Sequence, residues 1–204
     1  SNAMKNAFFV TASIACGKST FIEIANSLGF KSISADKIAH KILDENALEL
    51  EKIFSPFSLK NLLKKEKKID RKILGEIVFN NKEAKKILEN FTHPKIRAKI
   101  LEQMQILDKE NKAFFVEIPL FFESGAYENL GKVIVIYTPK ELSLKRIMQR
   151  DKLSLEAAKA RLDSQIDIEE KLKKADFIIK NTNSYADFRQ ECVKVIQEIS
   201  KGNM

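Results

Sequence analysis

Short apolar runs alternate with amphipathic stretches along this chain. The stretch from residue 18 to residue 28 places its apolar side chains on one helical face, and residues 185–200 have the same amphipathic pattern. The apolar runs have the length of buried strands, and they occupy residues 7–10, 31–34, 113–118, 132–137 and 176–180. Because strands separated by helices form parallel sheets, the pattern predicts an α/β fold with about five parallel strands and helices on both faces of the sheet.

Two longer helical segments interrupt this alternation. Residues 37–112 are rich in lysine, and residues 140–174 carry many charges of both signs. We therefore expect a core made of residues 4–36, 113–139 and 175–204, into which these two segments are inserted. Ligands of open parallel sheets bind beyond the carboxyl ends of the strands, so we expect the functional residues there.

The composition narrows the class of protein. Of the 204 residues, 44% are hydrophobic, which suits a compact globular chain. No apolar run approaches the ~20 residues of a membrane-spanning helix and no secretory signal is visible, so we expect a cytoplasmic protein without a membrane partner. The only cysteines, Cys16 and Cys192, form neither a disulfide framework nor a metal motif. Residues 1–3 precede Met4 and are interpreted as an expression tag remnant.

The net charge of +8 indicates an anionic partner, either a nucleic acid or a small phosphorylated metabolite. The densest basic run, residues 64–68, is interrupted by Glu66 and contains no aromatic residue. We interpret this run as a solvated loop and expect no nucleic-acid partner.

One segment has the pattern of a phosphate-binding loop. TASIACGKST, residues 11–20, follows the first predicted strand and opens the first predicted helix. In such loops backbone N–H groups surround the phosphates of a nucleotide, the lysine reaches the terminal phosphates, and the following hydroxyl ligates Mg²⁺. The lysine and the hydroxyl are Lys18 and Ser19, and the alternative is a helix N-terminus with an incidental lysine. The loop residues expected around ATP are Ser13, Ile14, Ala15, Cys16, Gly17, Lys18, Ser19 and Thr20.

Two alanines stand where such loops usually carry glycine. The cradle consists of backbone amides, which alanine supplies as well as glycine does. An L-residue at positive φ costs about 1–2 kcal/mol, so Ala12 and Ala15 imply either negative φ at both positions or a modest strain that the surrounding fold maintains.

The segments after the loop resemble one family. SADKIAH, residues 34–40, is similar to the DAD-type motif of dephospho-CoA kinases, the enzymes of the last step of coenzyme A synthesis. Further segments resemble this family in the same order, namely residues 69–79, 88–97, 117–123, 146–151, 161–165 and 175–181. The match extends from about Phe9 to Thr182. The family's loop is close to TGGIGSGKS, and the departure from it bears on nucleotide affinity rather than on reaction type.

The resemblance implies a P-loop NTPase-type sheet, with residues 37–112 as a helical dephospho-CoA subdomain and residues 140–174 as a helical lid. It implies an ATP-dependent kinase that transfers the γ-phosphoryl group of ATP to the 3′-hydroxyl of dephospho-CoA, giving CoA and ADP. The expected partners are these two small molecules, with Mg²⁺ bound to ATP. The expected state is a monomer or a weak homo-oligomer.

The resemblance also implies roles for single residues. Asp36 is expected to orient or deprotonate the ribose hydroxyl and to assist Mg²⁺ through water, and the alternative is a simple helix N-cap. Lys18 is expected to bridge the β- and γ-phosphates. Ser19 is expected to ligate Mg²⁺ directly, and Glu117 through a bound water, although an ordinary carboxylate at a strand end fits Glu117 equally well. Asn181 is expected near the adenine, where its backbone matters more than its side chain.

Arg146 and Arg150 lie one helical turn apart in the lid segment. One movement of the lid would therefore bring both guanidinium groups to the triphosphate, and Arg146 is the expected catalytic arginine. The alternative is that they form surface salt bridges with Asp151 or Glu156.

Three further residues join Asp36 in the expected substrate-binding set. Arg71 and Arg97 are expected to meet the pyrophosphate of dephospho-CoA. His93 precedes Pro94 in a context that predicts a helix start, and it either contacts the substrate or has a structural role. His40 is interpreted as structural.

The alternatives belong to other classes. Another P-loop small-molecule or nucleoside monophosphate kinase shares the loop and the lid, but has no need of the segments 34–40 and 117–123 together. A regulatory GTPase would carry an N-K-x-D motif in its late strands, and this chain has none there. A nucleic-acid-binding protein is the alternative that is not an enzyme, and it would explain only the positive net charge.

Overall fold

The chain forms two compact units in this computed structural model, which describes residues 3–202. The first unit comprises Ser1–Ser34 and Gln103–Met204, and the second comprises Ala35–Glu102. Residues 1 and 2, part of the segment interpreted as a tag remnant, lie outside the described residues.

The boundaries of the units differ from those expected from the sequence. The second unit ends at Glu102 rather than at residue 112, because one helix, α5 (Lys82–Asp108), continues across the boundary. Asp36, expected in the core, belongs to the second unit. The segment 140–174, expected as a separate lid, is grouped with the first unit.

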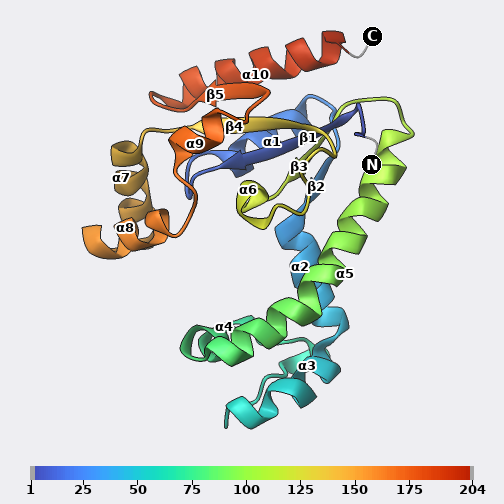
Figure 1. Ribbon diagram of the computed structural model, residues 1–204, viewed down its shortest axis with the longest axis vertical. Coiled ribbons are helices and arrows are strands. Elements are labelled where there is room, and N and C mark those ends of the chain that lie inside the picture. The colour runs from blue at the N-terminus through green and yellow to red at the C-terminus, as the bar shows by residue number, and fades with distance from the viewer. Residues whose placement is uncertain (1–2, 203–204) are drawn as a thin grey trace. The chain divides into compact units, whose positions relative to one another are not determined.

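The sheet of the first unit contains five strands in the order β2-β3-β1-β4-β5, and every pair of neighbours is parallel (Figure 1). In the register, Val10 lies beside Glu117 on one side and Ile134 on the other, so the carboxyl ends of the central strands meet at one edge. The strands are β1 (Ala7–Ala12), β2 (Ser32–Ser34), β3 (Phe114–Glu117), β4 (Lys132–Tyr137) and β5 (Phe177–Lys180). The α/β fold predicted from the apolar runs is confirmed.

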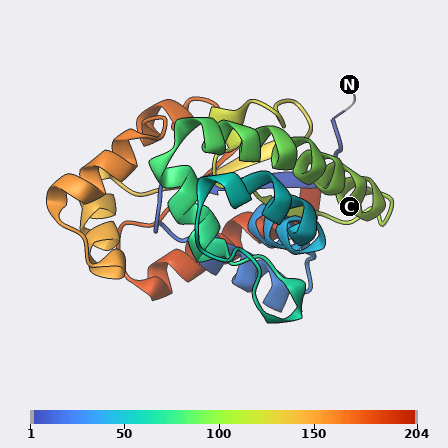
Figure 2. The same ribbon diagram turned by 90° about the horizontal axis from the view of Figure 1, so that it is seen from below.

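Helices cover both faces of this sheet because side chains of a strand alternate between the faces. Phe8 and Val10 of β1 are buried in one core with α1 and α10, whereas Phe9 points the other way and packs on Phe121 of α6, with ring centroids 4.8 Å apart. Two further helices, α7 and α8, lie side by side in both views (Figures 1 and 2). The helices of this unit are α1 (Lys18–Ser27), α6 (Phe121–Ser124), α7 (Lys140–Asp151), α8 (Leu155–Asp163), α9 (Ile168–Leu172) and α10 (Tyr185–Gly202).

The second unit is helical and has a core of its own. Leu50 and Phe54 of α3 are fully buried there with Leu74 of α4 and other apolar side chains. Its elements are α2 (Ala35–Glu45), α3 (Ala47–Phe54), the 3₁₀ turns η1 (Ser55–Phe57) and η2 (Lys65–Lys67), α4 (Arg71–Asn80) and most of α5. The basic run at residues 64–68 is exposed, as the sequence predicted for a solvated loop.

The helix start predicted at His93 and Pro94 is wrong, because both residues lie inside α5. Proline lacks an N–H and therefore deprives a helix interior of one i→i−4 hydrogen bond. The helix nevertheless continues, since it buries Thr92 before the proline and Ile100 after it. Tertiary packing thus overrides the local signal, and His93 is not a cap.

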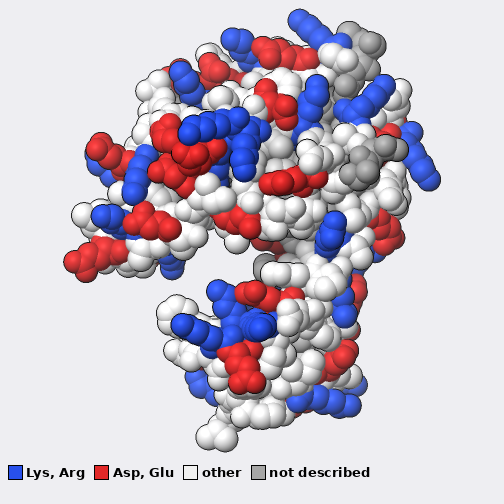
Figure 3. All heavy atoms as spheres, viewed as in Figure 1, with Lys and Arg blue, Asp and Glu red and all other residues white. Residues whose placement is uncertain are grey.

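Charge is spread over the surface. On the face shown in Figure 3, basic and acidic side chains are interspersed in both units and form no continuous basic region. None of the helices formed by residues 3–202 combines the length and the apolar character that crossing a membrane requires.

Candidate active site

The loop between β1 and α1 is shaped around Gly17. This residue has φ of 105°, a left-handed conformation that L-residues rarely adopt. A Cβ there would lie 2.7 Å from Asn181 Nδ2 and 2.8 Å from the Phe188 ring, so space as well as backbone conformation requires glycine. From Gly17 the chain enters α1, whose first-turn N–H groups have no partner within the helix and attract anions.

The two alanines of the loop behave differently. Ala12 ends β1 and does not have positive φ, whereas Ala15 has φ of 61°. The sequence left open whether both alanines have negative φ or whether a strained conformation is maintained. Ala12 is unstrained, whereas Ala15 has the strained conformation. The left-handed conformation of Ala15 costs about 1–2 kcal/mol, which the rest of the loop must offset.

Asn181, just after β5, braces this loop. Its side-chain Nδ2 donates to the carbonyl oxygen of Cys16 at 2.9 Å. Its backbone N–H donates to Tyr137 O at 2.8 Å, and its own carbonyl oxygen accepts a hydrogen bond from Arg146 Nη1 at 3.0 Å. One residue thus connects the phosphate loop, the end of β4 and the arginine of α7, and its side chain has a larger role than the sequence suggested.

The start of α7 is attached to the same loop. Ser143 Oγ lies 3.2 Å from Cys16 Sγ and donates to Thr138 O at 3.3 Å. Cys16, Thr138 and Ser143 are all buried. Sequence reasoning missed Thr138 and Ser143, although Ser143 precedes Arg146 by one helical turn and a shared face was therefore predictable.

Arg150 has a different environment from Arg146. Its Nε and Nη2 donate to the two carboxylate oxygens of Asp151 at 2.9 and 3.0 Å, and Arg161 of α8 donates to the same carboxylate at 2.7 Å. The hydrogen bond from Arg150 lowers the pKa of Asp151 below its usual value, and the same bond raises the pKa of Arg150. In this structure Arg150 therefore forms the salt bridge that the sequence offered as its alternative.

Ser19 and Glu117 are the residues considered for Mg²⁺. Ser19 is exposed in the first turn of α1, and Glu117 ends β3 beside Val10 of the strand that leads into the loop. Within residues 3–202 no three His, Cys, Asp or Glu side chains form a group able to hold a metal ion. This donor set fits Mg²⁺, which is commonly held by one or two protein ligands together with phosphate oxygens and water.

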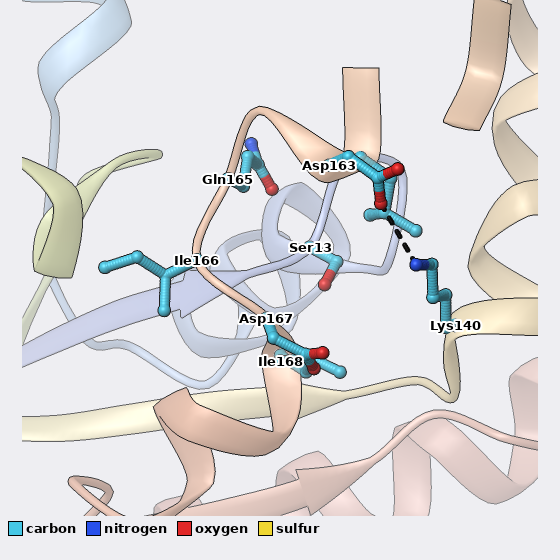
Figure 4. A pocket seen from close by; sticks show the side chains of 8 residues that line it. Ser13, Lys140, Asp163, Gln165, Ile166, Asp167 and Ile168 are labelled. Carbon is cyan, nitrogen blue, oxygen red and sulfur yellow. Dashed lines mark ion pairs between the residues drawn. The ribbon is translucent and has the colours of Figure 1, made fainter. Parts of the chain in front are cut away.

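A cavity of about 280 Å³ lies beside Ser13, the first loop residue after β1. An ion pair between Lys140 and Asp163, 3.0 Å apart, borders it on one side, and the loop before α9 borders it on the other (Figure 4). The lining residues are Ser13, Lys140, Leu162, Asp163, Gln165, Ile166, Asp167 and Ile168.

The remaining predicted site residues lie in the second unit. Asp36 is exposed and is the second residue of α2, so it is not the N-cap residue. Arg71 begins α4, with Nη1 3.9 Å from Asp44 Oδ2. His93 and Arg97 are exposed one turn apart on α5, and His40 is exposed one turn after Asp36 on α2.

The first unit has the defining arrangement of one class of enzyme. A loop of backbone amides joins its central strand to the first helix, and an arginine on the helix after the neighbouring strand bonds Asn181, whose side chain in turn bonds that loop. This is the architecture of P-loop phosphotransferases. The particular family follows from comparison with known proteins.

The family model of dephospho-CoA kinase matches residues 8–187. A dephospho-CoA kinase of Campylobacter jejuni (strain RM1221) is 97% identical over 98% of this chain and 100% of its own length. One from Helicobacter pylori (strain J99) is 39% identical over 96% of this chain and 98% of its own. A solved structure of dephospho-CoA kinase from Campylobacter jejuni, 97% identical, covers 98% of this chain and 100% of its own with a TM-score of 0.80.

The chain belongs to the dephospho-CoA kinase family, and it is an ATP-dependent kinase. The resemblance noted in the sequence is therefore confirmed, and the other P-loop kinases are not favoured.

Substitution of Ala15 by glycine tests the strain in the loop. A15G should raise the free energy of unfolding by about 0.5–1 kcal/mol, because glycine adopts positive φ without the Cβ clash. Chemical denaturation measures this change, and A12G in β1 is the control, which should lower stability instead. Destabilisation by A15G would contradict a strained alanine at this position.

Substitution of Asn181 by alanine tests the brace on Cys16. N181A removes one hydrogen bond worth about 1 kcal/mol, so KM for ATP should rise roughly fivefold through a less ordered loop. Steady-state kinetics measure the change, with N183A at a nearby exposed residue as the control. An unchanged KM would show that the loop keeps its conformation without this side chain.

Proposed function

We propose that this chain binds ATP at the loop of residues 13–20 and transfers its γ-phosphoryl group to the 3′-hydroxyl of dephospho-CoA. The observation that carries this assignment is the conformation of Gly17, which Asn181 and Phe188 enclose. That conformation turns the chain into α1. The N–H groups of the first helical turn, which includes Ser19, and the positive end of the helix dipole would then face the bound phosphates.

Charge neutralisation is the main task of the first unit in this proposal. Lys18 lies at the first position of α1, where its ammonium group would bridge the β- and γ-phosphates. Arg146 is already held at the loop through the carbonyl oxygen of Asn181, and a short movement of α7 would exchange that oxygen for a phosphate oxygen. Arg150 would reach the triphosphate only after giving up its ion pair with Asp151.

Mg²⁺ is the proposed cofactor, with the Ser19 hydroxyl as a direct ligand and Glu117 acting through a bound water. When bound with ATP, the ion neutralises negative charge on the β- and γ-phosphates. Glu117 is only 9% exposed at the end of β3, so its carboxylate is held in a fixed position rather than moving freely in solvent.

The second unit supplies the acceptor residues in this proposal. The Asp36 carboxylate would accept the proton of the 3′-hydroxyl while the 3′-oxygen forms a bond to the γ-phosphorus. The bond from that phosphorus to the bridging oxygen breaks, and ADP leaves. Arg71, His93 and Arg97 would bind the pyrophosphate and the remainder of dephospho-CoA, and their exposure leaves them accessible to such a ligand.

The cellular setting is also part of the proposal. A cytoplasmic enzyme acting as a monomer or a weak homo-oligomer suits this substrate pair. The net charge of +8 then serves two polyanionic substrates rather than a nucleic acid. The mixture of acidic and basic side chains in Figure 3 favours this interpretation.

An ADP-release assay with a panel of acceptors tests the function. Dephospho-CoA should stimulate ADP release at least an order of magnitude more than AMP or shikimate does, because only the correct acceptor is fully bound and aligned. Chelation of Mg²⁺ with EDTA should abolish the stimulated rate. Equal rates with AMP or shikimate would refute the acceptor assignment.

Substitution of Asp36 by asparagine tests the proposed base. D36N should lower kcat by about two to four orders of magnitude with KM for ATP nearly unchanged, because the amide cannot accept the proton. The control is E45Q, which changes an exposed carboxylate of the same helix. Wild-type turnover in D36N would remove Asp36 from the mechanism.

A further inference from the structure

An ion pair joins α6 and α9. Lys171 of α9 has no exposed side-chain surface, and its Nζ lies 3.2 Å from Oε2 of Glu123 in α6. Glu123 Oε1 is buried, and among the described residues it has no hydrogen-bond partner. Within residues 3–202 Lys171 Nζ has no hydrogen-bond partner either, and the Glu123 side chain is 16% exposed. Burying a charge without hydrogen bonds is costly, and apolar residues of similar volume often serve stability equally well. Stability alone is therefore a weak explanation for this pair.

The carboxylate of Glu123 also contacts the segment between α8 and α9. Its Oε2 accepts a hydrogen bond from the backbone N–H of Ile166 at 3.0 Å. Ile166 lies in the short connection between α8 and α9, and its own side chain is 39% exposed, so apolar packing holds this connection only in part. Lys171 supplies the opposite charge beside the carboxylate, and the carboxylate accepts the hydrogen bond that holds the connection.

This connection forms one wall of the cavity at Ser13. Gln165, Ile166 and Asp167 line the cavity, and Figure 4 shows Gln165 and Ile166 on the side of Ser13 away from the Lys140–Asp163 pair. Gln165 Oε1 is buried and has no hydrogen-bond partner among the described residues. A shift of Ile166 would therefore change the shape of the cavity and the placement of its polar groups.

The charges of the lining indicate which substrate part suits the cavity. Asp163 is paired with Lys140, and Asp167 accepts a hydrogen bond from the N–H of Glu169, so the lining carries one carboxylate that no lining cation neutralises. The proposed triphosphate site lies at the backbone amides that lead into α1, whereas the cavity offers donors and acceptors to a neutral group rich in hydroxyls and ring nitrogens. In the proposed reaction that group is the acceptor end of dephospho-CoA, its ribose and adenine.

We propose that Glu123, whose charge Lys171 neutralises, is a positioning residue that keeps the Gln165–Asp167 segment against the cavity at Ser13 and so aligns the acceptor nucleoside. The inference rests on the proposed function of this chain as a dephospho-CoA kinase. Glu123 acts through the backbone of Ile166 and does not itself touch the substrate.

Two double variants distinguish the hydrogen bond to Ile166 from the effect of the ion pair. Both K171M/E123Q and K171M/E123L are neutral, but only the glutamine offers an oxygen to the N–H of Ile166. KM for dephospho-CoA should rise at least roughly fivefold in K171M/E123L and stay within about twofold of wild type in K171M/E123Q, with KM for ATP unchanged in both. Hydrogen exchange of the peptide containing residues 165–168 should be faster only in the leucine variant.

Controls keep the result interpretable. E170Q/K173M removes an exposed ion pair of the same helix, 3.1 Å long, and should leave both KM values unchanged. If K171M/E123L does not fold, K171M/E123A gives the same contrast without overpacking. Equal KM values for dephospho-CoA in the glutamine and the leucine or alanine variants would overturn the inference, even if their thermal stabilities differ. Failure of the proposed function is distinct, because wild-type protein would then show no ADP release stimulated by dephospho-CoA.

Discussion

The left-handed backbone at Gly17 is the constraint on which the nucleotide-binding unit depends. It lets the chain leave the central strand, turn sharply and enter α1 with the helix N-terminus open to an anion. The same turn brings Gly17 against Asn181 and Phe188, leaving no room for a side chain. Because Asn181 follows β5 and Phe188 belongs to α10, the C-terminal part of the chain helps to hold a loop near the N-terminus.

Polar contacts link the chemically important segments of the first unit to one another. Asn181 connects the carbonyl oxygen of Cys16 to the guanidinium of Arg146, and Ser143 connects the same loop to the start of α7. Such contacts are directional and fix positions to within a fraction of an ångström, which phosphoryl transfer requires. Glu123, paired with Lys171, makes a further polar contact of this kind with the backbone of Ile166 at the wall of a neighbouring cavity.

The proposed chemistry divides between the two units. The first contains the groups that would neutralise the triphosphate, and the second contains Asp36 and the basic residues proposed for the acceptor. The two units would bind negative charge by different means. The loop uses backbone amides and a helix dipole, whereas the second unit uses exposed charged side chains. The positive net charge of the chain has a role in both places.

The sequence alone determined the five strands, their parallel arrangement, the phosphate loop and the family. These depend on local apolar periodicity and on motifs whose residues are close together in the chain, so no tertiary information is needed to find them. The predicted helix start at His93 failed because local signals cannot weigh the burial of a long helix on both sides of Pro94. Only the tertiary structure decided that Ala15 is left-handed, that the side chain of Asn181 braces Cys16, and that Lys171 is buried against Glu123. The contacts of Asn181 with Cys16 and of Lys171 with Glu123 join residues distant in sequence, which meet only when the fold has brought their elements together.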